Sequence, residues 1–128
     1  MATDSKRRSL RSSKEVGNDY EQLAAEYLVK NGYKIIKRNY RLRSGEIDII
    51  ARKEDIISFI EVKYRKNSDY GNGLDAVNIA KQRKISKAAL HFIAFNNISE
   101  KITFSFDVID IGGEGYINHI KNAFDFKE

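Results

Sequence analysis

The sequence predicts an α/β fold in which a mixed central sheet is flanked by helices, and three observations support it. Apolar residues recur at helical spacing in two stretches. Five other stretches are rich in β-branched and aromatic residues, as strands are. No proline-rich linker or internal repeat divides them, and 128 residues with 41% hydrophobic content suit one compact domain.

The first helix is predicted over residues 15–31, where apolar positions recur every three or four residues. Gly32 follows at the place of a helix C-cap. The next stretch, YKIIKRNYRL at residues 33–42, predicts a strand because it is rich in aromatic and β-branched residues. The sequence Arg-Ser-Gly at residues 43–45 then predicts a turn.

Two further strands are predicted over residues 46–52 and 56–63, on either side of the charged residues 53–55. The polar, glycine-containing sequence YRKNSDYGNG at residues 64–73 predicts a loop. A second, longer helix is predicted over residues 74–96, where apolar positions again fall on one helical face.

The C-terminal part alternates between apolar and polar residues over residues 102–111 (ITFSFDVIDI), which predicts a fourth strand. A glycine-rich turn at residues 112–115 and a last strand at residues 116–120 follow. The order is helix, three strands, helix, two strands. This order favours an α/β or α+β sheet with helices packed on it.

Charge is unevenly distributed along the chain, whose net charge is +5. Residues 1–14 carry five basic residues against one acidic residue and are rich in serine, so we expect a disordered basic arm before a single domain at residues 15–128. Residues 37–87 hold thirteen basic and seven acidic residues. That excess suits a positive face for phosphates, although scattered solvated lysine and arginine residues are the commoner cause of such a bias.

Several functional classes are excluded by what the sequence lacks. It has no cysteine, which excludes disulfides, a thiol nucleophile and a zinc ribbon and is compatible with a reducing cytosol. It has no apolar run approaching about 18 residues and no apolar segment behind its N-terminal basic residues. We therefore expect a cytoplasmic protein with no membrane association.

The stretch GEIDIIARKEDIISFIEVKYR places charged residues inside two apolar strands. If these strands form a hairpin centred on residues 54–55, Asp48 lies opposite Glu61 and Glu46 lies opposite Lys63. Side chains alternate faces along a strand, so the four charges would share one face. A slip of one residue would separate them. The other face would carry the core residues Ile47, Ile49, Ile60 and Val62.

Two carboxylates paired across a ladder repel each other unless a positive charge lies between them. Mg²⁺ or Mn²⁺ would neutralise Asp48 and Glu61, because these ions bind carboxylate, carbonyl and water oxygens as ligands. Such an ion can also bind a phosphate of the substrate. The ammonium of Lys63 could position the attacking water in phosphodiester hydrolysis. The alternative is a solvent-facing hairpin with a surface ion pair worth under about 1 kcal/mol. The acidic-x-Lys triplet occurs three times in the chain and decides nothing by itself.

Further residues have both a functional and an ordinary interpretation. Glu21, beside the apolar stripe of the first helix, is either a further acid of the site or a flank residue. Lys81 and Gln82 could face the site or a phosphate, or lie at a helix edge. Arg65 and Lys66 are candidate phosphate contacts or part of a solvated loop.

Aromatic and imidazole side chains raise a similar choice. Tyr64 and Tyr70 in the predicted loop could stack on an unpaired base, although loop tyrosines usually cover the edge of a core. His91 and His119 lie in separate, mostly apolar elements without a second histidine at ligand spacing, which favours structural roles.

The run GEIDII, followed thirteen residues after its Asp by the EVKYR segment, resembles the YraN-like family of predicted endonucleases. That family is placed within the PD-(D/E)XK restriction-endonuclease-like superfamily. The resemblance covers nearly the whole domain but not the arm at residues 1–14. It extends to the segments YEQLAAEYL, GYKIIKRNYR, KQRKI, FDVIDI and HIKNAF.

This resemblance implies an αβββαβ core with a catalytic site. Asp48 and Glu61 would be metal ligands, Val62 would lend a carbonyl to the metal, and Lys63 would position water. Glu21 matches an acid that related archaeal Holliday junction resolvases use to complete the site. The proline of the PD motif is absent, since residue 47 is isoleucine.

We therefore expect an endonuclease that requires Mg²⁺ or Mn²⁺ and acts on DNA, including branched or single-stranded recombination and repair intermediates. Symmetric cutting of two strands would favour a homodimer. Two alternatives stay open: a non-catalytic nucleic-acid-binding or adaptor module that retains the fold, and a charged patch that is only structural.

Overall fold

The computed structural model describes the chain at residues 13–65, 77–113 and 115–128, with side chains described from residue 19 onward. The predicted basic arm lies outside the described residues, except that Ser13 and Lys14 begin the first helix. The elements occur in the predicted order. They are α2 (Ser13–Lys30), β1 (Lys34–Leu42), β2 (Gly45–Lys53), β3 (Ile56–Arg65), α3 (Ile79–Phe95), β4 (Thr103–Gly112) and β5 (Ile117–Phe124).

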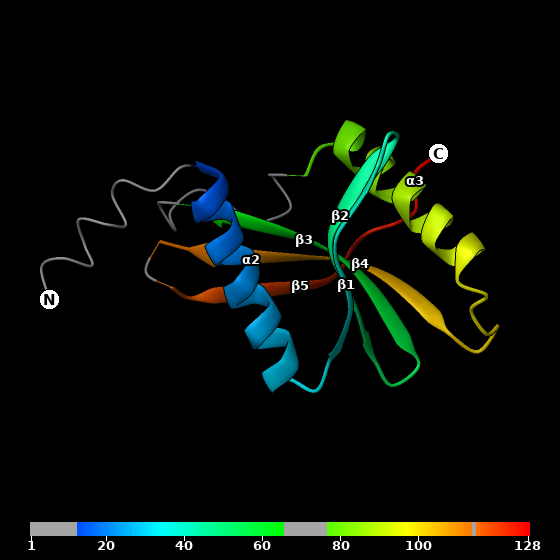
Figure 1. Ribbon diagram of the computed structural model, residues 1–128, viewed down its shortest axis with the longest axis horizontal. Coiled ribbons are helices and arrows are strands. Elements are labelled where there is room, and N and C mark those ends of the chain that lie inside the picture. Colours follow the sequence, from blue (N-terminus) through cyan, green and yellow to red (C-terminus); the bar gives the residue numbers. More distant parts are fainter. Residues whose placement is uncertain (1–12, 66–76, 114) are drawn as a thin grey trace, which may run out of the picture.

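The five strands form one mixed sheet in the order β1-β2-β3-β4-β5. Neighbouring strands are antiparallel except β3 and β4, which are parallel and are joined through α3. Such a crossover is what parallel neighbours require. The predicted α/β class is therefore confirmed, with a mixed sheet and two helices in the described part of the chain (Figure 1).

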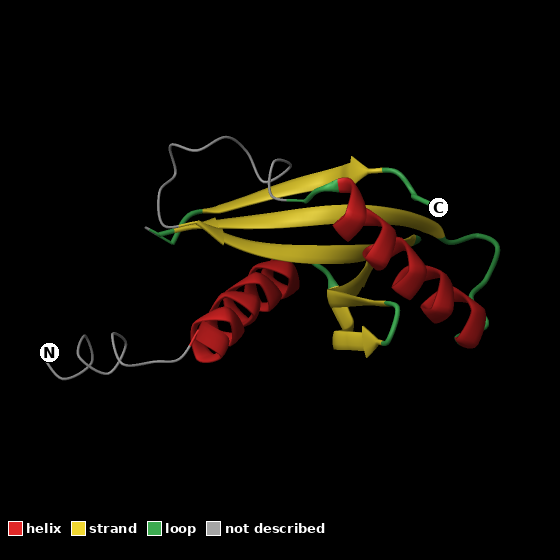
Figure 2. Ribbon diagram, turned by 90° about the horizontal axis from the view of Figure 1, so that it is seen from above, coloured by secondary structure: helices red, strands yellow, loops and turns green. Residues whose placement is uncertain are grey.

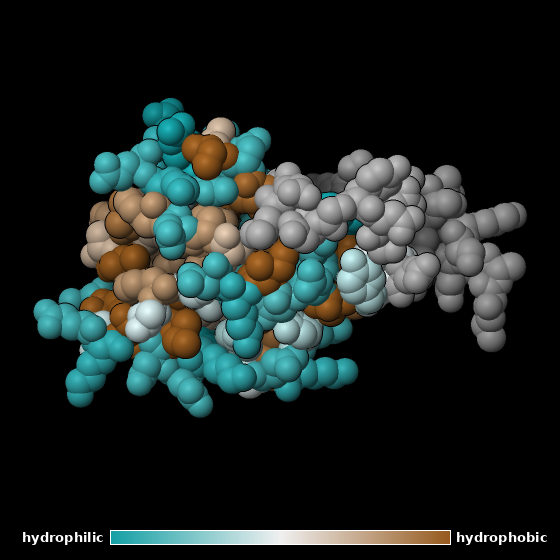
Figure 3. All heavy atoms as spheres, turned by 180° about the vertical axis from the view of Figure 1, so that it is seen from behind, coloured by the Kyte–Doolittle hydropathy of each residue, from teal (hydrophilic) through white to brown (hydrophobic). Residues whose placement is uncertain are grey.

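The two helices bury different apolar clusters against the sheet, and Figure 2 shows them well apart with strands between them. Helix α2 packs through Ala24, Ala25 and Leu28 on one cluster. Helix α3 packs through its own apolar stripe on the other cluster, which also contains Phe59 and Val108. Seen from behind, the surface shows apolar residues over part of one face with hydrophilic residues around them (Figure 3). Among the described residues, no helix combines the length and apolar character needed to cross a bilayer.

Helix α3 begins later than predicted. The predicted start at residue 74 lies outside the described residues, but Val77 and Asn78 precede the helix. Asn78 is the N-cap, and its side chain accepts a hydrogen bond from the backbone N–H of Lys81 at 2.9 Å. An asparagine favours this position because its side-chain oxygen satisfies an N–H that has no partner within the helix.

The β2–β3 hairpin has the predicted register, but its ladder is shorter than predicted. Cα partners run from Lys53↔Ile56 to Ile49↔Ile60, as a hairpin centred on residues 54–55 requires. On the N-terminal side of Ile49, β2 remains paired with β1 only. On the C-terminal side of Ile60, β3 remains paired with β4 as far as Arg65. We call the opening between the two diverging strands the fork; it is bounded by Asp48 on β2 and by residues 61–64 on β3.

This divergence corrects the predicted orientation of one core residue. Ile49 and Ile60 pack on the α2 side, with Val62 against the same cluster, as their predicted shared face requires. Ile47 instead packs in the cluster on the α3 side. Once β2 is no longer held by β3, its N-terminal end turns toward α3 (Figure 1). Simple alternation of side chains along the strand therefore fails between Ile47 and Ile49.

Gly45, at the start of β2, is the residue that brings this strand against α3. A Cβ added to Gly45 would lie 1.9 Å from the backbone carbonyl oxygen of Lys84, so the strand or the helix would have to move. We expect Gly45→Ala to lower the free energy of unfolding by about 1–3 kcal/mol, as overpacking does. Urea denaturation measures the change, and Ser44→Ala at the neighbouring exposed position is the control. Equal stability of the two variants would contradict this close packing.

A buried polar network lies on the sheet near the C-terminal half of α2. His119 donates from Nε2 to Asp107 Oδ2 at 2.8 Å, and its Nδ1 lies 3.0 Å from the Tyr27 hydroxyl. Asp107 Oδ1 accepts from the Ser105 hydroxyl and, at 3.0 Å, from the backbone N–H of Asn122. Burial alone would raise the pKa of Asp107, but these hydrogen bonds outweigh it and hold the pKa below its ordinary value. The structural role predicted for His119 agrees with this network.

Candidate functional site

The fork opens into a pocket of about 360 Å³ in which acidic, basic and aromatic side chains meet. Four elements contribute to it: α2, β2, β3 and α3. Six of the residues predicted for the site or for nucleic-acid contacts line it together. The full lining is Tyr20, Glu21, Glu46, Asp48, Glu61, Val62, Lys63, Tyr64 and Lys81.

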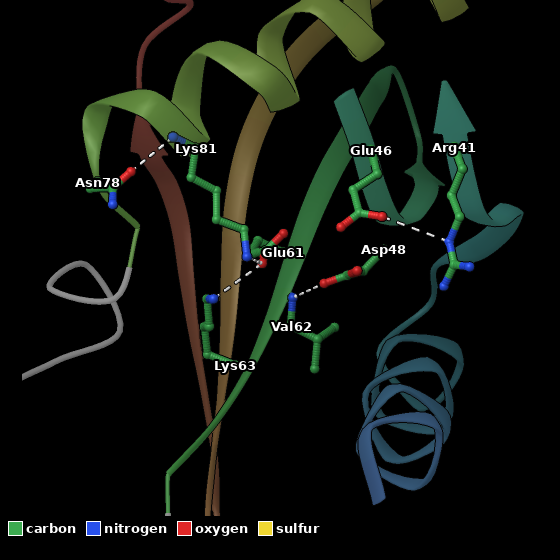
Figure 4. Close-up of polar contacts among 8 residues, drawn as sticks. All are labelled: Arg41, Glu46, Asp48, Glu61, Val62, Lys63, Asn78 and Lys81. Carbon is green, nitrogen blue, oxygen red and sulfur yellow. Dashed lines mark hydrogen bonds and ion pairs between the residues drawn. The ribbon is translucent and has the colours of Figure 1, made fainter. Parts of the chain in front are cut away.

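Asp48 occupies the point where the two strands separate. Its Oδ2 accepts a hydrogen bond from the backbone N–H of Val62 at 2.8 Å, so the side chain satisfies an N–H on the edge of β3 that faces the fork (Figure 4). Burial, with the neighbouring charge of Glu61 adding to it, raises the pKa of Asp48 from 3.8 to about 7. The Val62 N–H and the ammonium of Lys81 oppose this rise.

Glu61 is the most buried charge of the pocket, with 4% of its side chain exposed. Its Oε1 lies 2.6 Å from Lys81 Nζ and 3.4 Å from Lys63 Nζ, and Figure 4 shows both lysines pointing at this carboxylate. Its Oε2 is buried and has no hydrogen-bond partner. One oxygen of Glu61 is therefore paired with the lysines, while the other can still accept a hydrogen bond or bind a cation.

The two lysines next to Glu61 respond differently to their surroundings. Burial and the contact with Lys81 lower the pKa of Lys63, against the attraction of Glu61. Burial also acts to lower the pKa of Lys81, but its hydrogen bonds to Glu61 and Lys63 and the charges of Glu61 and Asp48 raise the pKa overall. Lys81 is therefore the lysine that stays protonated and neutralises the Glu61 carboxylate, whereas Lys63 more readily gives up its proton.

Glu21 reaches the same pocket from α2. Burial raises its pKa, the charges of Arg38 and Arg41 oppose the rise, and the charges of Glu61 and Glu46 add to it. Its Oε1 is buried without a hydrogen-bond partner. Glu21 thus has an oxygen available at the site, as the interpretation of this residue as a further acid requires.

The predicted pairing of Glu46 with Lys63 is wrong. Glu46 also lines the pocket, but its carboxylate lies 3.7 Å from Arg41 on the neighbouring strand, while Lys63 turns to Glu61 (Figure 4). Both Arg41 and Glu46 are more than half exposed, so this pair adds little stability. The cause is the fork, because the ladder ends before residues 46 and 63 can face each other.

The remaining predicted contacts lie outside this pocket lining. Arg65 Nε lies 3.6 Å from Asp110 Oδ1, and only 18% of the Arg65 side chain is exposed. Gln82 donates to the backbone carbonyl of Val77 at 3.0 Å, next to the N-terminus of α3. Lys66 lies outside the described residues, as does Tyr70. A role for these side chains on nucleic acid stays a prediction.

The pocket residues fit a small hard cation. Within residues 13–65, 77–113 and 115–128, no group of three or more His, Cys, Asp or Glu side chains is placed to hold a metal ion. Mg²⁺, however, is usually held by only one or two carboxylates together with waters and a substrate phosphate. Glu61 Oε2 has no partner, and the pKa of Asp48 is raised. Both observations indicate that these carboxylate oxygens have less positive charge around them than they could bind. Asp48 and Glu61 would hold the ion, with the carbonyl of Val62 between them in sequence.

The raised pKa of Asp48 predicts how stability depends on pH. Because the folded-state pKa of about 7 exceeds the ordinary 3.8, the folded chain binds this proton more tightly than the unfolded chain does. The favourable contribution is complete below about pH 4 and is lost as the pH rises toward 7.

Asp48→Asn should remove this loss, because the amide oxygen can still accept from Val62. In a metal chelator we expect the variant to be more stable than the wild type at pH 8 by about 2–4 kcal/mol, and to lose that advantage near pH 4. Urea denaturation at the two pH values measures the difference. Identical pH dependence of the two proteins would show that Asp48 titrates normally.

A larger cavity of about 440 Å³ lies at the opposite end of the β2–β3 hairpin, near Lys53 and Ser58. None of the predicted site residues lines it. The chemistry predicted from the sequence therefore belongs to the smaller pocket at the fork, where the carboxylates and lysines meet.

Sequence reasoning missed two features of the pocket. It left open whether Lys81 faces the site, a phosphate or only a helix edge, and it did not predict that Lys81 makes the shortest contact to Glu61. It did not place Tyr20 at the site, but Tyr20 packs on the α2-side cluster and also lines the pocket and stacks on Tyr64. The spacing from the Asn78 cap to Lys81 was the only signal for the first, and the position of Tyr20 directly before Glu21 was the only signal for the second.

The fold and the site together define a small α/β protein with a cluster of carboxylates and lysines where two strands of a mixed sheet part. The chain belongs to the uncharacterised protein family UPF0102, whose family model matches residues 20–111. The predicted YraN-like membership is thereby confirmed.

Relatives match over nearly their whole length and are named only as UPF0102 proteins. The protein from Caldicellulosiruptor bescii is 44% identical over 116 residues, which cover 87% of this chain and 98% of the relative. The protein from Trichlorobacter lovleyi is 47% identical over 120 residues, which cover 90% and 94%. The protein from Alkaliphilus metalliredigens is 45% identical over 114 residues, which cover 88% and 99%.

Proposed function

We propose that this protein is a metal-dependent endonuclease that hydrolyses phosphodiester bonds in DNA and has a restriction-endonuclease-like fold. The observation that carries the proposal is the meeting of Asp48, Glu61 and Lys63 in one pocket at the fork. The order of one helix, three strands, one helix and one strand up to β4 supports the fold assignment. The motifs GEIDII and EVKYR support it independently.

The parts that phosphodiester hydrolysis needs are present on this chain. A bound Mg²⁺ or Mn²⁺ would polarise the scissile phosphate and lower the pKa of a bound water. Asp48 and Glu61 would hold the ion, and Glu21 has an unpartnered oxygen near them. Lys63, whose pKa is lowered, can hydrogen-bond the attacking water and neutralise charge that develops on the phosphate.

Basic residues beside the pocket would hold the DNA backbone. A hollow next to the fork is lined by Glu46, Lys81 and Lys84 together with the start of α3. The N-terminal end of a helix and lysine ammonium groups both attract phosphates. Arg41, more than half exposed at the pocket edge, adds positive charge on the β1 side.

One observation favours a second candidate, a nucleic-acid-binding or adaptor module whose site is idle. Lys81 already neutralises one oxygen of Glu61 at 2.6 Å, and the described residues offer two close carboxylates rather than three metal-ligating side chains. Such a module would bind DNA in a salt-sensitive manner that ignores divalent ions.

Incubation of the purified protein with a panel of nucleic acids tests the proposal. The panel holds duplex, single-stranded, flapped and four-way DNA and a single-stranded RNA, each with Mg²⁺, Mn²⁺ or a chelator. We expect cleavage of DNA that requires the metal. Binding without cleavage under every condition would favour the adaptor module instead. Analytical ultracentrifugation of the protein with and without DNA tests whether it cuts as a homodimer. We also propose that the protein is cytoplasmic, where it would meet DNA.

A further inference from the structure

Two tyrosines, Tyr20 and Tyr64, line the pocket in addition to its carboxylates and lysines. The rings of Tyr20 on α2 and Tyr64 on β3 are stacked, with centroids 3.8 Å apart and an angle of 12° between their planes. Both rings line the pocket that contains Asp48, Glu61 and Lys63. An aromatic pair therefore stands beside the carboxylates.

The position of each ring follows from its neighbour in sequence. Tyr20 precedes Glu21 on α2, and Tyr64 follows Lys63 on β3. Because side chains alternate along a strand, Tyr64 points to the α2 side of the sheet while Lys63 points toward Lys81 of α3. The fork thus has an aromatic wall on its α2 side and a basic wall on its α3 side.

The two rings are closer together than is usual for packed aromatic side chains. Their centroids lie 3.8 Å apart and their planes are almost parallel, whereas the stacked core pair Phe106 and Phe124 has centroids 5.1 Å apart. A parallel stack directs its flat outer faces away from the pair, where a third planar group can add to it. Tyr64 is 37% exposed, in contrast with Tyr33, which is 9% exposed under α2. A partly exposed ring beside a pocket lined by carboxylates and lysines suits a base that stacks on it.

We propose that Tyr20 and Tyr64 form a stacking platform for an unpaired base next to the scissile phosphate. A base inside a duplex has both faces covered by its neighbours, so only a single-stranded or locally unpaired nucleotide can lie on the platform. The strand would then run from the aromatic wall, with its phosphate at Lys63, toward Lys81 and Lys84 on the basic wall. This inference rests on the proposed function and specifies its substrate: DNA that is unpaired at the cut.

A fluorescent base analogue tests the platform without any need for catalysis. A single-stranded oligonucleotide with one 2-aminopurine is titrated with the full-length protein in a chelator, since 2-aminopurine fluorescence is quenched when the base stacks on an aromatic ring. We expect quenching with the wild type and with Tyr64→Phe. Tyr64→Ala should lose the quenching and bind roughly tenfold more weakly, as loss of one stacked base implies. Circular dichroism verifies that each variant is folded.

A matched control separates stacking from the loss of any surface tyrosine. Tyr116 is 45% exposed and precedes β5, whose partner β4 pairs with β3, but it does not line the pocket. Tyr116→Ala should quench and bind as the wild type does. Equal weakening by Tyr116→Ala and Tyr64→Ala would overturn the platform, as would quenching that survives in folded Tyr64→Ala.

The result for the platform is distinguishable from the result for catalysis. Quenching that depends on Tyr64, with no cleavage in Mg²⁺ or Mn²⁺, would support the platform and refute the nuclease. Metal-dependent cleavage that is equally fast on duplex and single strands and unchanged in Tyr64→Ala would refute the platform and leave the nuclease standing. Cleavage that is fastest on single-stranded or flapped DNA and falls in Tyr64→Ala would support both.

Discussion

Asp48→Asn and Lys63→Ala are each expected to reduce Mg²⁺-dependent cleavage of DNA by roughly 100-fold or more. Asparagine keeps the shape of Asp48 and can still accept the 2.8 Å hydrogen bond from Val62, so the fork should persist while a charge for the metal is lost. Alanine at residue 63 removes the ammonium that lies 3.4 Å from Glu61 and faces the pocket. Initial cleavage rates at saturating metal measure both losses.

Asp55→Asn provides the matched control for these variants. Asp55 is an exposed carboxylate in the turn of the same hairpin, at the end away from the fork. It should cleave at the wild-type rate. Titration with Mg²⁺ adds a second reading, because thermal stabilisation by the metal should occur in Asp55→Asn and disappear in Asp48→Asn. Undiminished cleavage by folded Asp48→Asn and Lys63→Ala would refute the assignment of the site.

The fold class and hairpin register were predictable from the sequence because both depend on local patterns. Periodicity distinguished helices from strands, and the charged turn at residues 53–55 fixed which residues of β2 and β3 face each other. Each predicted helix and strand is present, whereas the predicted loop at residues 64–73 lies outside the described residues from residue 66 onward and begins with two residues of β3. Helix α3 nevertheless starts later than predicted, because Val77 has the apolar character of the helical stripe but lies before the Asn78 cap.

The fork was not predictable in the same way, because it results from a competition between partners. On the N-terminal side of Ile49, β2 stays paired with β1 and turns toward α3, where Gly45 permits close contact with the helix backbone. No local pattern reports that contact, which is made with Lys84, far along the chain. The predicted meeting of Asp48 with Glu61 survived because the Asp48 side chain reaches across to Val62, whereas the pairing of Glu46 did not.

Site residues contributed by other elements were the hardest to predict. Lys81 meets Glu61 because α3 crosses from β3 to β4 and lays its first turn over the fork. Tyr20 meets Tyr64 because α2 packs on the opposite side of the same strand. Sequence spacing within one element can show which residues share a face, but only the packing of two elements shows which side chains touch.

Asp107→Ala is expected to cost the fold about 3–5 kcal/mol, the usual penalty for removing one partner of a buried ionic or hydrogen-bonded group. The Asp107 side chain is 1% exposed, and its loss would leave His119, Ser105 and the Asn122 N–H without their acceptor.

For a chain of this size the loss should appear as a fall in melting temperature of roughly 10–20 °C. Asp125→Ala, at an exposed position beyond β5, is the control and should melt near the wild type. Since the pKa of Asp107 is lowered, its stabilisation is present above its ordinary value of 3.8 and is lost as the pH falls through the folded-state pKa. The difference between wild type and Asp107→Ala should therefore be large at pH 7 and shrink in strong acid. A difference that does not change with pH would show that cavity formation, rather than the carboxylate, accounts for the loss.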